Sequence, residues 1–444
     1  MSTDLRAALD DGPMSRTQWV AIAVCLLLNM LDGFDVLVMA FTGKSVAAEW
    51  GLSATQLGLL LSAAPVGMAL GSMLVAPWAD RIGRRPIILG CLTLSSVAML
   101  LSSLTQSAGQ LGLLRVLAGI GIGSIIASSS VASAEWSNRR WRGLAVSLNA
   151  TGYALGATLG GLIAVVLIGG YGWRAVFLFG GVATTVAIPL VIWGLPESMD
   201  FLLNRRPAGA LTRINKLAAR CRLPQLTALP EQLTAPRSVS GNYRELLTPR
   251  LRRTTLLMWF VFFAVMAGFY FVTSWTPTLL VQAGLTPAQG LTAGTLLNLG
   301  GVFGSALLGV LAARFALRSV LRGYLVCTAV LLAVFIASTS QLGLAFAVGI
   351  GVGLLVNGCV AGLFAFTATV YDSQVRATGF GTALAISRTG AILAPFAAGA
   401  LLDAGMSPQQ LYLGAGALFV VTAVVLSFVR VATSPRVAAP VAAH

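Results

Sequence analysis

The sequence predicts an all-α membrane protein in which twelve membrane-spanning helices form two pseudo-symmetric six-helix bundles. Of the 444 residues, 57% are hydrophobic and only 10% are charged, whereas soluble domains carry about 25% charged residues. Apolar runs of about 20 residues, enough to cross a bilayer, start near residues 18, 54, 86, 110, 144, 173, 255, 290, 319, 343, 378 and 410. This composition and this recurrence exclude a soluble protein.

A polar, arginine-rich stretch after the sixth run divides the spans six and six. The expected parts are a cytoplasmic N-terminal tail (1–17), an N-terminal bundle (18–194), a central cytoplasmic loop (195–253), a C-terminal bundle (254–430) and a cytoplasmic C-terminal tail (431–444).

Internal repetition supports this division of the chain. Residues 143–161 align with 381–399, which pairs Gly152 with Gly390, and 309–318 resemble 76–85. Two related halves predict a substrate site between them, near the middle of the membrane.

The net charge of +15 follows the predicted topology. Most of the 29 Lys and Arg residues fall at loops on one side, and such loops are cytoplasmic in membrane proteins. Both termini are therefore expected on the cytoplasmic side of a bacterial-type inner membrane, and a nucleic-acid partner is not indicated.

Five cysteines, mostly inside apolar runs, predict neither a disulfide framework nor a metal site. The first run contains acids and lacks a clear cleavage site, so it is expected to be an uncleaved span.

Two carboxylates lie inside that first span, at Asp32 and Asp35. A charge in hydrocarbon costs about 2.5 to 3.5 kcal/mol on insertion scales, and such residues usually face a water-filled path for ions or protons. Their spacing of three residues puts both on one helix face, where like charges favour a single shared proton. The alternative is that one of them pairs structurally with an arginine of another span.

The segment after the second span reads Ala76-Pro-Trp-Ala-Asp80-Arg-Ile-Gly-Arg-Arg85. It resembles the loop signature G-x-L-A-D-R-x-G-R-[KR] of the major facilitator superfamily, with Ala76 and Trp78 as departures. The resemblance implies the two-bundle fold and a cytoplasmic gate made by residues of this loop. The gating residues assigned to it are Asp80, Arg81, Gly83, Arg84 and Arg85.

Arg115 and the glycines that follow it in the fourth span resemble the R-x-x-x-G-x-G element of proton-coupled members of that superfamily. A guanidinium stays charged and matches a carboxylate, so Arg115 is predicted either to hold an acidic substrate or to pair with a nearby acid.

The segment Leu31-Asp-Gly-Phe-Asp35 resembles the D-G-x-D element of the aromatic acid:proton symporter family of the superfamily. The resemblance extends over most of the membrane domain, including the Leu195-Pro-Glu-Ser exit of the sixth span and Arg376-Ala-Thr-Gly leading to Arg388. It casts Asp32, Asp35, Arg115 and Arg388 as transport residues and adds Arg376 to the gate.

One departure from that family concerns histidine. The family pattern often carries one near the loop between spans eight and nine, whereas the only histidine here is His444. Proton coupling is therefore expected to use a carboxylate of Asp32, Asp35 or Glu135.

Several residue types are suited to binding an aromatic acid. Arg388 lies midway along its span without an acid in its own helix, which makes it the best candidate for a carboxylate clamp. Phe34, Phe269, Tyr270 and Trp275 could stack on a ring, although such residues more often pack against lipid or the core. Asn298 and Asn357 could bond ring substituents or, as easily, join helices.

The sequence therefore predicts a transporter, not an enzyme, that takes up an aromatic carboxylate such as 4-hydroxybenzoate or benzoate together with protons. The expected coupling partner is the proton gradient, with no cofactor, and a monomer is expected to suffice. The alternatives are another organic acid, such as muconate or phenylpropionate, and drug/proton antiport. Antiport is disfavoured because residues 142–172 lack the proline of the Gly-Pro element typical of antiporters. A ligand sensor is disfavoured by the short tails.

Overall fold

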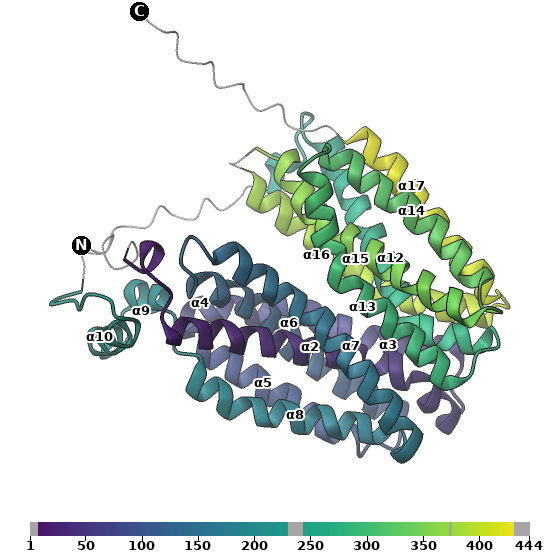
Figure 1. The fold of residues 1–444 in the computed structure, drawn as a ribbon, viewed down its shortest axis with the longest axis horizontal. Coiled ribbons are helices and arrows are strands. Elements are labelled where there is room, and N and C mark those ends of the chain that lie inside the picture. The colour runs from purple at the N-terminus through teal and green to yellow at the C-terminus, as the bar shows by residue number, and fades with distance from the viewer. Residues whose placement is uncertain (1–7, 230–242, 373–374, 430–444) are drawn as a thin grey trace, which may run out of the picture.

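The computed structural model describes residues 8–229, 243–372 and 375–429. Within these ranges, twelve helices are long and apolar enough to cross a membrane, and Figure 1 shows the helices gathered into two groups. The predicted fold class is confirmed. The segment 431–444 with His444 lies outside the described residues.

The first bundle contains the spans that precede the central loop. Its helices are α2 (Arg16–Trp50), α3 (Ala54–Leu70), α5 (Arg84–Ser102), α6 (Ala108–Glu135), α7 (Arg142–Tyr171) and α8 (Trp173–Gly194).

The second bundle contains the spans that follow the central loop. Its helices are α12 (Arg252–Gln282), α13 (Pro287–Ala312), α14 (Leu317–Ala337), α15 (Leu342–Val370), α16 (Arg376–Asp403) and α17 (Pro408–Phe428). In the chain segment that connects the two bundles are the shorter helices α9 (Met199–Arg205), α10 (Ala210–Cys221) and α11 (Tyr243–Leu246).

Capping boxes begin four of the spans. The side chains of Ser15, Ser53, Thr286 and Ser407 each accept a hydrogen bond from the backbone of a glutamine three residues on, whose side chain accepts one in return. Each box satisfies two of the backbone N–H groups that a helix start leaves without partners. The local sequence therefore fixes where these helices begin.

Corresponding helices pack in the same way in the two bundles. The first helix of each bundle packs against the fifth (α2 with α7, α12 with α16), and the second against the fourth (α3 with α6, α13 with α15). The two glycines paired by the sequence repeat take equivalent places. A Cβ added to Gly152 would lie 2.9 Å from the Leu26 carbonyl oxygen of α2, and one added to Gly390 would lie 2.4 Å from the Phe263 carbonyl oxygen of α12.

The bundles meet at one end of the molecule. We call the side on which α2 begins and α17 ends the terminal side, and the opposite side the far side. Helix α3 packs on α16 and α7 on α13 across the bundles, through Gly58 against Pro395 and Gly161 against Thr295, all in the far-side halves of their helices. Toward the terminal side the two groups of helices diverge (Figure 1).

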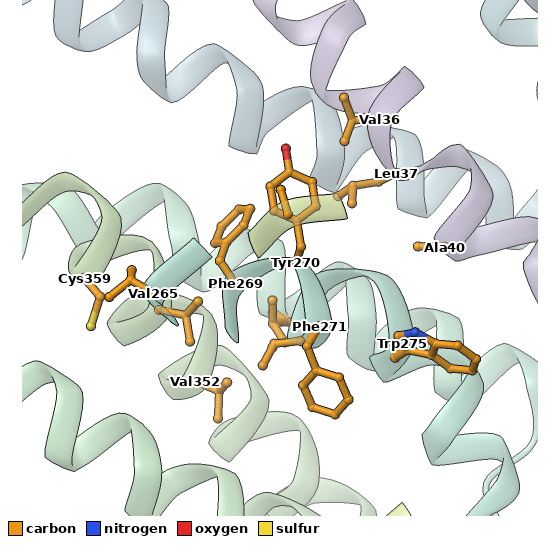
Figure 2. Packing of buried hydrophobic residues seen from close by; sticks show 14 of the residues in the cluster. Val36, Leu37, Ala40, Val265, Phe269, Tyr270, Phe271, Trp275, Val352 and Cys359 are labelled. Atoms are coloured by element: carbon orange, nitrogen blue, oxygen red, sulfur yellow. The ribbon is translucent and has the colours of Figure 1, made fainter. Parts of the chain in front are cut away.

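A third contact between bundles is made by α2 and α12. Figure 2 shows Tyr270 and Trp275 of α12 beside the helix that carries Leu37 and Ala40. All four side chains are buried. Helix α12 therefore lies at the centre of the molecule, between its own bundle and α2.

The segment expected as a loop after the second span is helical as far as Ile82. Helix α3 continues through a π-helical turn (Gly71–Val75), a 3₁₀ turn (Ala76–Trp78) and α4 (Ala79–Ile82). Pro77 fits near the start of the 3₁₀ turn, where a missing N–H costs little. The break comes at Gly83, whose φ of 117° disfavours any residue with a side chain.

We expect Gly156→Ala to destabilise the N-terminal bundle. Its new Cβ would lie 1.8 Å from the Met30 carbonyl oxygen, and overpacking of this kind costs about 1–3 kcal/mol. The unfolding midpoint of the detergent-purified protein should fall by several degrees. Gly169→Ala in the same helix is the control, because a Cβ there meets nothing within 4 Å. Equal midpoints for the two variants would contradict the packing described.

Candidate functional site

A buried ion pair joins two helices of the N-terminal bundle. Arg115 of α6 donates from Nη1 to Oδ1 of Asp35 in α2 over 2.5 Å. The Arg115 side chain has no exposed surface, and that of Asp35 is 5% exposed. The sequence left open whether Arg115 holds substrate or pairs with an acid, and in this conformation it pairs with Asp35.

The other contacts of Arg115 also lie within the bundle. Its Nη2 donates to Ser102 Oγ and lies near Met99 Sδ, each at 3.1 Å, and its guanidinium lies 5.0 Å from the ring centroid of Phe177. These contacts fix the guanidinium, and with it the position of Asp35.

Asp32 lies one helical turn before Asp35, and its surroundings differ. It is buried, yet its Oδ2 has no hydrogen-bond partner among the described residues. A buried polar atom without a partner is rare because its desolvation is not repaid. The structure thus separates the two aspartates into a paired one and one with a vacant acceptor.

Asn29 marks the polar layer next to Asp32. Its Nδ2 lies 2.8 Å from Ser129 Oγ and 2.7 Å from Asn149 Oδ1. These contacts connect α2 with α6 and α7. One turn further along α2, Gly33 touches the backbone of Tyr153, since an added Cβ would lie 2.0 Å from its carbonyl oxygen. Asp32 is therefore held on a helix that cannot shift without clashing with α7.

The C-terminal bundle contributes Arg388 from α16. It is half-buried, and no carboxylate in the described ranges forms an ion pair with it. Tyr270 lies within hydrogen-bonding reach of its guanidinium, and Tyr153 is in the electrostatic field of both Arg388 and Asp32. The vacant acceptor of one bundle and the unpaired cation of the other therefore share one neighbourhood, bordered by two tyrosines.

Tyr270 reaches that neighbourhood from α12. Figure 2 shows its hydroxyl directed toward the helix that carries Val36 and Leu37, and its Oη lies 4.0 Å from Met68 Sδ of α3. Phe269 packs edge-on against its ring. Tyr270 therefore projects from the C-terminal bundle into the N-terminal one.

Three other residues expected to bind substrate make packing contacts. The Phe34 ring lies between α7 and α8, where a Cβ on Gly160 or Gly180 would come within 2.4 Å of it. Asn298 and Asn357 each donate to a backbone carbonyl of their own helix. Asn357 also touches Gly301 of α13, which makes it a helix-joining residue.

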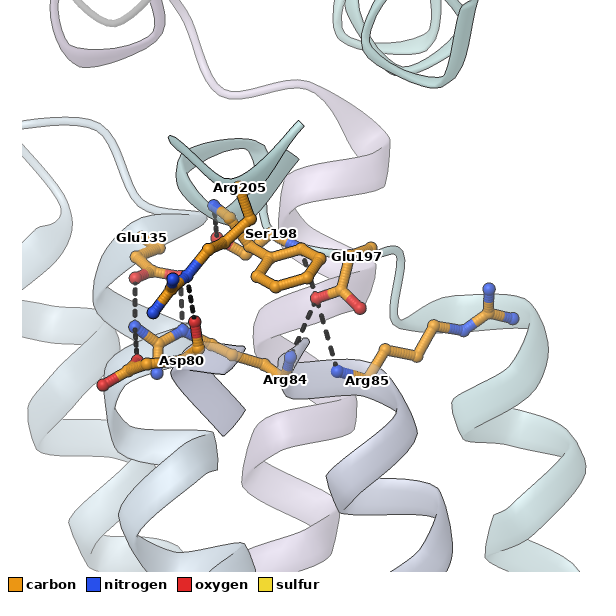
Figure 3. Close-up of polar contacts among 8 residues, drawn as sticks. Asp80, Arg84, Arg85, Glu135, Glu197, Ser198 and Arg205 are labelled. Atoms are coloured by element: carbon orange, nitrogen blue, oxygen red, sulfur yellow. Dashed lines mark hydrogen bonds and ion pairs between the residues drawn. The ribbon is translucent and has the colours of Figure 1, made fainter. Parts of the chain in front are cut away.

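Three of the residues expected at the gate, Asp80, Arg84 and Arg85, lie together on the terminal side (Figure 3). Arg84 makes two parallel hydrogen bonds to Glu135, of 2.8 and 2.6 Å, and lies 3.6 Å from Asp80. Glu135 thus lies at this end of α6 with Arg84, whereas Asp32 and Asp35 lie deep in the bundle.

Glu197 is the residue of this cluster to which the sequence assigned no role. Its Oε1 accepts from the backbone N–H groups of Arg84 and Arg85, at the start of α5. A Cβ on Gly83 would lie 2.4 Å from its Oε2. A glycine within a charged motif signals special backbone geometry, but nothing in the sequence pairs it with an acid more than a hundred residues away.

The remaining gate candidates are exposed or bond to backbone carbonyl groups. Asp80 is 71% exposed, and its backbone carbonyl accepts from Arg205. Arg85 donates to the Ile192 carbonyl, Arg81 is exposed, and Arg376 donates to the Tyr371 carbonyl. Their gating role stays a prediction. Among the described residues, no three His, Cys, Asp or Glu side chains gather as a metal-binding set.

Comparison with solved structures gives the class of fold. The xylose transporter XylE from E. coli in an inward-open conformation superimposes with a TM-score of 0.73 over 94% of this chain and 97% of that one, at 17% identity. The shared architecture is the two-bundle fold of membrane transporters.

Sequence comparison gives the family. Residues 22–381 match the Major Facilitator Superfamily. A gallate transporter of Pseudomonas putida is 32% identical over 98% of both chains, and the 4-hydroxybenzoate transporter PcaK of Acinetobacter baylyi is 30% identical over 90% of this chain and 88% of that protein. The chain belongs to the major facilitator superfamily, within its aromatic acid transporter family.

We expect Arg115→Gln to destabilise the protein strongly, because it leaves the Asp35 carboxylate buried without its partner. Breaking a buried pair in this way costs about 3–5 kcal/mol. The double variant Asp35→Asn/Arg115→Gln should recover most of the unfolding midpoint, since no buried charge remains. Arg174→Gln, which breaks a half-exposed pair with Glu49, is the control and should cost about 1 kcal/mol or less. A single variant as stable as this control would contradict the assignment.

Proposed function

We propose that this protein takes up an aromatic carboxylate together with protons by alternating access. The observation that carries the proposal is that an aspartate of one bundle and an arginine of the other, which do not pair with each other, both lie near Tyr153. Asp32 offers a vacant buried acceptor, and Arg388 on the opposite bundle has no acid partner in the described parts of the chain. A guanidinium without an acid partner can hold a carboxylate, and a buried acid without a partner can hold a proton, so together the two residues are suited to carrying both.

The two aspartates take different parts in this proposal. Asp35 is held by Arg115 and serves as a structural charge. Asp32 is the proton carrier, because an ionised carboxylate without a partner is costly in a buried site while a protonated one is far less so. Glu135 and Arg115, both tied into ion pairs, are not needed for the proton step.

Arg388 holds the substrate carboxylate. A guanidinium offers two parallel N–H donors that match the two carboxylate oxygens. Tyr270 and Tyr153 border the same space with aromatic faces and hydroxyls. The relatives named for gallate, 4-hydroxybenzoate and benzoate support a ring-bearing acid. A phenylpropionate is the second candidate, because a relative in Escherichia coli is named a 3-(3-hydroxy-phenyl)propionate transporter.

Proton symport suits this cargo for an electrical reason. We assign the terminal side to the cytoplasm, from the excess of Lys and Arg there. Moving one negative charge inward against a membrane potential costs about 2.3 kcal/mol per 100 mV. A proton carried with each carboxylate removes that cost, and a second one makes entry favourable.

We expect Asp32→Asn to abolish accumulation driven by a pH gradient while exchange of labelled for unlabelled substrate continues. The amide keeps the shape of the side chain but cannot carry a proton. Uptake and counterflow of labelled 4-hydroxybenzoate in liposomes separate the two activities. Asp35→Asn is the matched control and should lose both, because Arg115 is then left without its counter-ion. Accumulation by Asp32→Asn at the rate of the parent would contradict the proton-carrier role.

We expect Arg388→Lys to weaken binding of benzoate-type ligands although it keeps the charge. An ammonium cannot make both parallel hydrogen bonds, and losing one charge-assisted bond costs about 1.5–3 kcal/mol, or roughly ten- to a hundredfold in affinity. Calorimetric titration of the purified protein measures this, with Arg314→Lys on the exposed terminal side as the control. If Arg388→Lys and Arg388→Ala both bind as tightly as the parent, the clamp lies elsewhere.

A further inference from the structure

Asp403 forms a hydrogen-bonded link between the two bundles on the far side. It is the last residue of α16 in the C-terminal bundle. Its two carboxylate oxygens accept from the backbone N–H groups of Ala54 (3.0 Å) and Thr55 (2.8 Å). These two residues begin α3 in the N-terminal bundle.

The link completes the cap of α3. The first four N–H groups of a helix have no partner within it. Within the N-terminal bundle, Ser53 accepts hydrogen bonds from two of these N–H groups. Its side chain accepts from Gln56 and its carbonyl oxygen from Leu57. Asp403 accepts from the other two. Its negative charge also lies at the positive end of the α3 dipole.

Close backbone contacts continue along α3 and α16 next to this link. A Cβ on Gly399 would lie 2.2 Å from the Ala54 carbonyl oxygen, and one on Gly58 would lie 2.6 Å from that of Pro395. Further along, Ser62 Oγ donates to the Ile392 carbonyl oxygen over 2.7 Å. The far side is therefore closed by direct backbone contact, and the Asp403 carboxylate is at its outer edge.

We propose that Asp403 is a latch that holds the far side closed and is released when the protein opens in that direction. We call the contact of Asp403 with Ala54 and Thr55 the α3–α16 latch. Its two hydrogen bonds exist only while the bundles meet, because their donors and acceptors belong to different bundles. Opening of the far side exchanges them for bonds to water. The inference rests on the alternating access of the proposed function and is independent of the substrate carried.

The latch favours one conformation without being needed for folding. Ala54, Thr55 and Asp403 are near the surface, so water can replace the lost bonds when the carboxylate is removed. Asp403→Ala should therefore leave the helices folded and raise the population open to the far side. From the loss of two hydrogen bonds and one dipole interaction at an exposed place, we expect a rise of about three- to tenfold.

The test measures the distance between the bundles on the far side in the absence of substrate. Spin labels on Ala48→Cys of α2 and Gln409→Cys of α17, both exposed, report that distance by double electron–electron resonance. The exposed Cys327 is first replaced by serine. Asp403→Ala should increase the fraction of long distances, and Asp403→Asn, which keeps one accepting oxygen, should give an intermediate fraction.

Ser407→Ala is the matched control. It removes a cap at the same side of the protein, but this cap serves α17 within the C-terminal bundle alone. Its distance distribution should match that of the parent. Equal distributions for Asp403→Ala and the parent, or an equal shift in Ser407→Ala, would overturn the latch. Because no substrate is present, failure of the substrate assignment leaves this result unaffected, and the transport assays of Asp32→Asn and Arg388→Lys test that assignment separately.

Discussion

The buried pair of Arg115 and Asp35 is the interaction on which the rest of the site depends. A charge in the middle of a membrane is tolerated only when it is paired or faces water, so this pair fixes how α6 and α2 face each other. With α2 fixed in this way, Asp32 takes its place one turn earlier with a vacant acceptor. Asp35 thus holds α2 against α6, and the Asp32 carboxylate is left without a hydrogen-bond partner on one oxygen.

Packing within each bundle differs from packing between the bundles. Inside each bundle, glycines bring helices into backbone contact, as Gly156 does against Met30, and such contacts resist displacement. Between the bundles, the contacts on the far side include the Asp403 hydrogen bonds and the close approach of Gly58 to Pro395. Rigid bundles with a separable interface are what rocking around a central site requires.

Much of the fold was predictable from the sequence because lipid imposes a simple rule. Each span must be a long apolar helix whose backbone bonds are satisfied internally, so twelve helices and a six-and-six division follow from hydrophobic runs and one polar loop. The glycines paired by the sequence repeat, Gly152 and Gly390, each lie close to the first helix of their own bundle. The segment ending at Ile82 was wrongly expected as a loop, because a proline and charges do not reveal a π turn.

The charges inside the membrane can be read from the sequence, since Asp32, Asp35, Arg115 and Arg388 interrupt apolar runs. Which of these charges neutralise one another depends on how the helices pack. From the sequence, Arg115 was a candidate both for holding a substrate and for pairing with an acid, and in the structure it lies beside Met99 and Ser102 and pairs with Asp35. The contacts of Glu197 with Gly83 and of Asp403 with α3 likewise appear only in the tertiary structure. Helix packing determines which side chains far apart in the chain come into contact. The residue pattern along one helix does not show which helix will lie beside it.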